Sequence, residues 1–258
     1  SREQRFAKAV NAGCDQLGGE EDVVTMLSAI NNGLISKSRI DEAVYRMLVQ
    51  KFEQGLFESP FVDATTAEEL VGSGRARAAG RNAQRRSIIC LKKPSSVNSS
   101  TRYYLENFSH SQADEVTSLN DADAAIIKLS TPHEDLHPNF FFGSRQQEGD
   151  IDFKPTLQVA KRIKALSKKV PTIAVIQMSR PAVVTDIIND LDGLYVDLGV
   201  SDDLMINAIS SQIETEGTLP FELPRSMHAV RSQRPDYPSD SQDALFQVGA
   251  DYKNNEGL

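Results

Sequence analysis

The sequence predicts an α/β protein whose mostly parallel sheet is covered by helices. Four short segments are almost continuously apolar, as strands buried on both faces are: residues 87–91, 124–129, 172–176 and 193–198. Helical patterns lie between them, so strand and helix alternate along the chain. The chain has 258 residues, enough for more than one folding unit at roughly 150 residues per domain.

Three helices are expected before residue 60. Apolar residues at helical spacing mark the first at Phe6 and Val10 and the second across residues 23–30. The third is expected to begin at Ser38, with Asp41 completing a variant of the capping box, and to end at Gly55. Because residues 2–10 already look like the middle of a helix, we expect the chain to be a piece of a longer protein.

The remaining elements of the α/β pattern are shorter. A further strand is expected at residues 103–105. Helices are expected at four places, the first weakened by its glycines: residues 67–83, 157–168, 182–189 and 204–213.

Composition argues against several classes of partner. The net charge of −8 disfavours a nucleic-acid or anionic-membrane surface, and basic clusters at residues 75–86 and 161–169 have the spacing of solvated helix faces. No apolar run approaches the ~18 residues of a membrane span. Cys14 and Cys90 lie far apart in apolar or small-residue surroundings, so we expect buried free thiols.

The strand at residues 124–129 runs into a loop that is dense in titratable groups. In an open α/β sheet, ligands bind beyond the carboxyl ends of the strands, where residues 130–137 are expected to lie. His133 to His137 also spell H-E-x-x-H, the pattern of a zinc peptidase helix. Pro132 and Pro138 flank this run and disfavour that helix, and no third ligand stands out, so no metal site is predicted.

Three stretches near the start of the chain closely resemble glycoside hydrolase family 3: residues 12–15, 33–48 and 51–62. The resemblance continues at residues 85–93 and 217–224, and it thins at residues 94–120 and after 244. In that family the first run leaves a catalytic (β/α)8 barrel and crosses to a second α/β sandwich domain. The resemblance therefore implies a barrel remnant at residues 1–53, a linker at 54–66 and an α/β sandwich domain at 67–258.

The resemblance implies a retaining exo-β-glycosidase, most simply a β-glucosidase, that needs no cofactor. Its partners would be β-linked glucosides or short oligosaccharides and an N-terminal barrel domain that carries the nucleophilic aspartate. This chain alone is then expected to be inactive, because no glycosyl-enzyme can form without that nucleophile. Xylosidases and N-acetylglucosaminidases belong to the same family.

The resemblance also implies that the second domain supplies the general acid/base from a loop. Glu134, in a Thr-Pro-His-Glu setting after the strand, matches that place best, and Glu148 is the alternative. Retaining glycosidases hold nucleophile and acid/base about 5–5.5 Å apart. His133 and His137 could transfer protons, but loop histidines more often hydrogen-bond sugar hydroxyls or backbone. Both are predicted to bind substrate.

Other interpretations stay open for these residues. Asp15 is a further candidate for substrate binding, or a turn aspartate that caps Gly18 and Gly19. The loop could be a solvated surface turn, although the aromatic run at residues 140–142 needs an apolar partner. The alternative function is a non-catalytic carbohydrate-binding or partner-docking α/β module.

Overall fold

The computed structural model describes residues 1–109, 115–139 and 147–254, so the aromatic run at 140–142 lies outside the described residues. The chain divides into two compact units, Ser1–Ser73 and Gly74–Leu258. The domain limits expected at residues 53 and 66 stay a prediction. Among the described residues, no helix is both long and apolar enough to cross a membrane.

The first unit is built of helices. These are α1 (Arg2–Asn11), α2 (Val23–Asn31), α3 (Lys37–Glu53) and α4 (Ala64–Leu70). Ala7, Val10, Ala29 and Ile35 form its small core. The predicted three helices are confirmed, although the α3 cap is Ser36 and not Ser38, because the Ser36 hydroxyl accepts from the Arg39 amide.

The end of α3 is fixed by Gly55, as predicted. Gly55 has a φ of 66°, which a side chain would strain, and the Leu56 amide donates to the Lys51 carbonyl at 3.0 Å. The prediction of a single helix at residues 67–83 is wrong. Gly72, with a φ of 68°, separates α4 from α5 (Gly74–Ser87).

The second unit contains a five-stranded sheet within its described residues. Its strands are β1 (Ile89–Lys92), β2 (Tyr103–Glu106), β3 (Ala124–Ser130), β4 (Thr172–Gln177) and β5 (Gly193–Asp197). Their order is β1-β5-β4-β3-β2, and only the β1–β5 pair is antiparallel. The predicted mostly parallel sheet is therefore confirmed.

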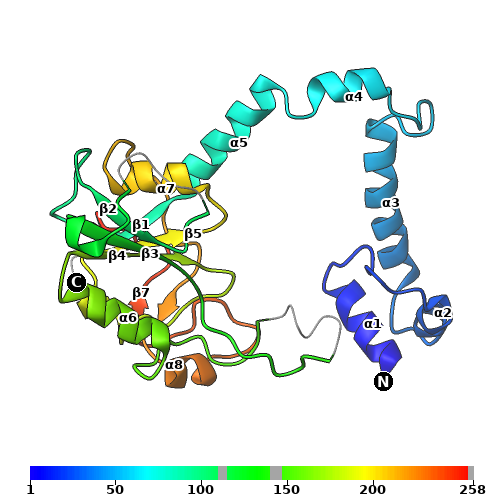
Figure 1. Ribbon diagram of the computed structural model, residues 1–258. Helices are drawn as coiled ribbons and strands as arrows, with labels where there is room; N and C mark the ends of the chain where they lie inside the picture. The colour runs from blue at the N-terminus through cyan, green and yellow to red at the C-terminus, as the bar shows by residue number, and fades with distance from the viewer. Residues whose placement is uncertain (110–114, 140–146, 255–258) are drawn as a thin grey trace. The chain divides into compact units, whose positions relative to one another are not determined.

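Helices cover both faces of this sheet (Figure 1). Because side chains alternate along a strand, Ile127 of β3 packs with α6 (Gln158–Ser167) while Ile126 packs with α7 (Asp202–Ile209) on the other face. This double burial explains why the strands are apolar without interruption.

Smaller elements complete the second unit. These are the 3-10 turns η1 (Leu119–Asp121) and η3 (Ile188–Asp190), helix α8 (Met227–Ser232), and strands β6 (Leu223–Pro224) and β7 (Ala244–Phe246), which pair with each other.

The helix expected at residues 182–189 is wrong. Val183 instead exchanges backbone hydrogen bonds with Ile151 and Phe153, which keeps this β-branched residue extended. A turn and η3 follow it.

The family's closing strand at residues 217–224 is divided. Gly217 bridges Ile89 at the β1 edge, where a Cβ would lie 2.7 Å from the Ile88 carbonyl oxygen, and only Leu223–Pro224 continues as a strand. Both cysteines are free. Cys90 is buried as expected, but Cys14 is exposed.

A buried charge cluster joins β3, β5 and α7. The Lys128 ammonium lies 2.8 Å from Asp202 and 3.3 Å from Asp197, and both carboxylates are buried. Burial disfavours the charged amine, but the hydrogen bond from Lys128 to Asp202 and the two negative charges outweigh it and raise the pKa of Lys128.

We expect Lys128→Met to lower the free energy of unfolding by about 3–5 kcal/mol at pH 7, because two buried carboxylates lose their cation. The raised pKa means that the wild-type stabilisation is complete below pH ~10 and is lost as pH rises through the folded-state value.

Urea denaturation at pH 7 measures this difference, with the exposed Lys161 of α6 changed to Met as the control. Equal stability of Lys128→Met and Lys161→Met at pH 7 would contradict the expectation.

Candidate functional site

The two carboxylates predicted as acid/base candidates are backbone neighbours. Beyond β3, Glu134 and Glu148 form an antiparallel bridge in which the Glu134 amide donates to the Glu148 carbonyl at 2.8 Å. We call residues 131–150 the acidic loop, described except for 140–146. Since β2, β3 and β4 run parallel, this loop leaves the sheet at the edge where ligands bind in such folds.

The side chain of Glu134 is exposed and lies over Gly149. A Cβ at position 149 would come within 2.7 Å of both Cβ and Cδ of Glu134, and Gly149 has a φ of 73°. Glu134 therefore depends on a residue that has no side chain there. No hydrogen bond or ion pair joins its carboxylate to another side chain in the described part of the loop.

Glu148 is paired with a histidine of the same loop. Its Oε2 lies 2.6 Å from Nδ1 of His137, and the side chain of Glu148 is 25% exposed against 65% for His137. The pair is an ion pair only while the imidazole is protonated. One oxygen of Glu148 is thus already occupied.

His133 and His137 do not share a helix face. The segment is extended at Glu134, and His133 points Nδ1 towards the Thr131 carbonyl at 3.5 Å, the limit of a hydrogen bond. Among residues 1–109, 115–139 and 147–254, His, Cys, Asp and Glu side chains form no group of three that could hold a metal ion. The geometry that makes H-E-x-x-H a zinc site is not present.

A cavity of about 580 Å³ opens at the carboxyl ends of β2, β3 and β4. Apolar side chains such as Phe153 and Leu157 line it together with polar ones: Asn107, Lys128, Ser130, Thr131, His133, Gln158 and Gln177. Amides and hydroxyls of this kind can hydrogen-bond a polyhydroxylated ligand. Of the predicted site residues, His133 reaches this cavity.

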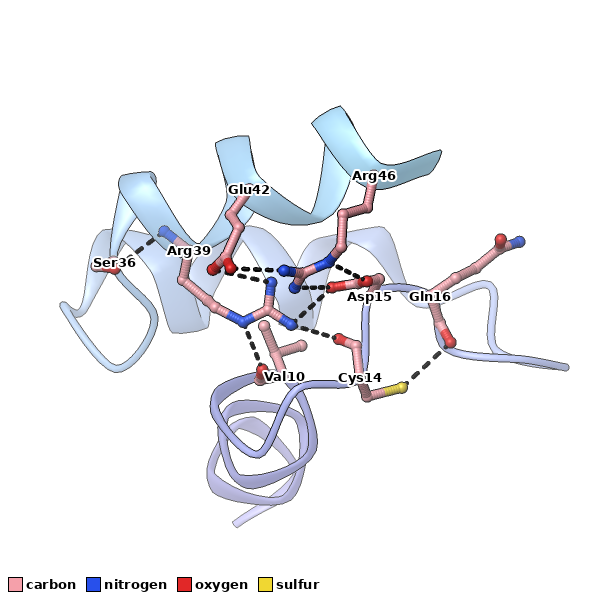
Figure 2. Close-up of polar contacts among 8 residues, drawn as sticks. All are labelled: Val10, Cys14, Asp15, Gln16, Ser36, Arg39, Glu42 and Arg46. Carbon is pink, nitrogen blue, oxygen red and sulfur yellow. Dashed lines mark hydrogen bonds and ion pairs between the residues drawn. The ribbon is translucent and has the colours of Figure 1, made fainter. Parts of the chain in front are cut away.

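Asp15 lies in the first unit, where its carboxylate is held by two arginines (Figure 2). Arg46 binds both of its oxygens at 2.7 Å, and Arg39 adds a bond of 2.8 Å to Oδ1. The hydrogen bonds from Arg46 and then Arg39 hold the pKa of Asp15 well below its usual range. These contacts join the turn after α1 to α3 instead of capping Gly18 and Gly19, and a role of Asp15 in substrate binding stays a prediction.

The sequence patterns did not predict Arg180 as a residue of this site. Arg180 follows β4 and donates to carbonyls of the acidic loop. Its position just beyond a predicted buried strand could have indicated its place in the site, because parallel strands end at a common edge of the sheet.

We expect Asp15→Asn to loosen the first unit, because a neutral amide cannot pair with two guanidinium groups. A lowered pKa means that the wild-type contribution is present above about pH 4 and is lost as pH falls through the folded-state value. Hydrogen exchange of residues 36–48 at pH 7 measures the loosening, with Asp41→Asn as a control on the same helix. Unchanged exchange would leave Asp15 free for a role in substrate binding.

We expect Gly149→Ala to displace the Glu134 side chain and to strain the backbone at a positive φ, with a cost of order 1–3 kcal/mol. Unfolding midpoints of Gly149→Ala and of Gly80→Ala, a helix position with open space around it, provide the comparison. Equal unfolding midpoints would mean that the segments around Glu134 and Glu148 are not held against each other.

The chain has clear relatives among known proteins, although no family model matches it. It is 39% identical over 253 residues to a periplasmic β-glucosidase/β-xylosidase of Dickeya chrysanthemi and 36% identical over 260 residues to a probable β-glucosidase C of Aspergillus oryzae. These matches cover 95% of this chain but only 39% and 40% of the relatives.

Solved structures agree on the fold. An exo-1,3/1,4-β-glucanase of a Pseudoalteromonas species superposes with a TM-score of 0.62 at 20% identity, over 98% of this chain and 39% of that one. A β-glucosidase of Listeria innocua gives 0.61 at 16% identity, over 96% and 44%. The chain spans about two fifths of the length of its curated relatives, and it belongs, as its first sixty residues indicated, to glycoside hydrolase family 3.

Proposed function

We propose that this chain is the part of a retaining exo-β-glucosidase that supplies the acid/base, while an upstream barrel supplies the nucleophile. The observation that carries the proposal is the backbone bridge between Glu134 and Glu148, which brings the two candidate residues together beyond the carboxyl end of β3. The names of the relatives, β-glucosidase and β-glucosidase/β-xylosidase, support β-linked glucosides or short oligosaccharides as substrates.

The reaction would proceed in two steps. An aspartate of the upstream barrel attacks the anomeric carbon as the acid of this chain gives its proton to the glycosidic oxygen, which leaves with the aglycone. The same group, now a carboxylate, takes a proton from water as the water attacks the glycosyl-enzyme. Two inversions give net retention.

Glu134 is the favoured acid/base and Glu148 the alternative. The carboxylate of Glu134 makes no hydrogen bond or ion pair with another described residue, although the charge of Lys154 acts on it, so no such bond has to break before it meets a leaving oxygen. Glu148 has one oxygen on His137, so it would first have to release that imidazole or share its proton. His133 and His137 would then bind hydroxyls of the substrate.

A non-catalytic carbohydrate-binding module is the second candidate. The observation in its favour is the cavity at the ends of β2 to β4, whose amides and hydroxyls could hold a sugar without chemistry. Saccharide binding with no effect of either glutamate on turnover would favour it.

The first experiment compares aryl-β-glucoside hydrolysis by this chain and by the complete protein that contains it. We expect turnover only from the complete protein, because no glycosyl-enzyme forms without the nucleophile. In the complete protein, replacing the acid/base by glutamine should lower kcat on alkyl glucosides by about 10²–10⁴-fold.

Glu134→Gln, Glu148→Gln and, as an exposed matched control, Glu58→Gln distinguish the candidates. The true acid/base variant should regain activity on dinitrophenyl glucoside, which needs no proton for its leaving group, and should respond to azide. Turnover by this chain alone would place the nucleophile within these residues, and full activity of both glutamine variants would remove the acidic loop from the chemistry.

A further inference from the structure

The segment that follows β4 contacts both described parts of the acidic loop, which we call its first arm (residues 131–139) and its second arm (residues 147–150). The Thr131 hydroxyl donates to the Arg180 carbonyl at 2.8 Å, and the Thr131 amide donates to the Gln177 carbonyl at 3.1 Å. On the other arm, the Ser179 hydroxyl donates to the side-chain oxygen of Gln147. The first arm is therefore bound to β4 three residues before Glu134.

Arg180 itself holds the second arm. Its guanidinium donates through Nη1 to the Gln147 carbonyl and through Nη2 to the Gly149 carbonyl at 3.0 Å, and the side chain is partly buried. These two carbonyls stand on either side of Glu148. The fork of one guanidinium thus spans the residue whose own carbonyl accepts the Glu134 amide.

The backbone there needs such a support. Gln147 has a φ of 49° and Gly149 a φ of 73°, so Glu148 stands between two left-handed residues, one of which carries a side chain. Conformations of this kind persist where surrounding contacts over-determine them. Within the described part of the loop, the guanidinium provides two of those contacts from outside the loop.

We propose that Arg180 is the positioning residue of the acid/base: it fixes the backbone on which both candidate carboxylates stand. This inference rests on the proposed function, but it does not depend on which glutamate acts, because Glu134 and Glu148 are joined by the same bridge. A planar guanidinium can reach two carbonyls at once, whereas the point charge of a lysine cannot hold both in one geometry.

The test uses the complete protein with Arg180→Met and Arg180→Lys, and with Arg162→Met as control, since Arg162 pairs with Glu106 away from the loop. A misplaced acid slows glycosylation, the step that kcat/KM reports, only where the leaving group needs its proton. We therefore expect Arg180→Met to lower kcat/KM on an alkyl β-glucoside by about tenfold to a hundredfold, with little change in kcat/KM on dinitrophenyl β-glucoside. Arg180→Lys should recover part of the loss.

Hydrogen exchange gives a readout that does not depend on activity. In Arg180→Met, amides of residues 131–139 and 147–150 should exchange faster, while the sheet strands and the unfolding midpoint stay close to those of Arg162→Met.

Three results would overturn the inference. Unchanged exchange in the loop would mean that Arg180 does not hold it. Equal losses of kcat/KM on both glucosides would mean a general structural role. If Glu134→Gln and Glu148→Gln both keep full activity, the proposed function fails. Faster exchange in Arg180→Met would then mean that Arg180 stabilises the loop but does not position a catalytic group.

Discussion

Strand β3 is hydrogen-bonded along both edges and buried on both faces, and this constraint governs the second unit. Its neighbours β2 and β4 run parallel to it, and Ile126 and Ile127 enter separate cores on opposite faces. A strand held on four sides cannot slide by one residue without turning its apolar set over. The place where the chain leaves the sheet at Ser130 is consequently fixed, and with it the start of the acidic loop.

From that fixed exit, the loop is held by few but specific contacts. Thr131 and Arg180 bind it to the end of β4, and the Glu134–Glu148 bridge closes its base. Gly149 leaves room for the Glu134 side chain. These contacts hold the backbone of Glu134 and of Glu148 together beyond the end of β3, as the proposed acid/base role requires.

The two units of the chain have different kinds of polar support. In the first, Asp15 joins Arg39 and Arg46 near the surface, and the core beneath is small. In the second, Lys128, Asp197 and Asp202 form a buried cluster within a larger core. The modest core of the first unit agrees with a helical remnant completed by an upstream barrel, as the proposed function requires.

The sequence by itself determined the strands of the main sheet, most of the helices and the family. Burial on both faces and helical periodicity are local patterns, and the runs at residues 12–15, 33–48 and 51–62 are long enough to be specific. It also selected Glu134 and Glu148, although as competitors 14 residues apart rather than as neighbours. The helix expected at residues 182–189 failed because backbone bonds from residues 151 and 153 kept Val183 extended.

Only the tertiary structure decided which loops meet. The bridge between Glu134 and Glu148, the hold of Arg180 on the acidic loop and the arginine pair around Asp15 all join residues from separate segments. Their contacts follow from the order of the strands and the packing of the helices, which no short window of sequence contains. Local patterns fix the elements, whereas the chemistry of the site depends on which of their ends are brought together.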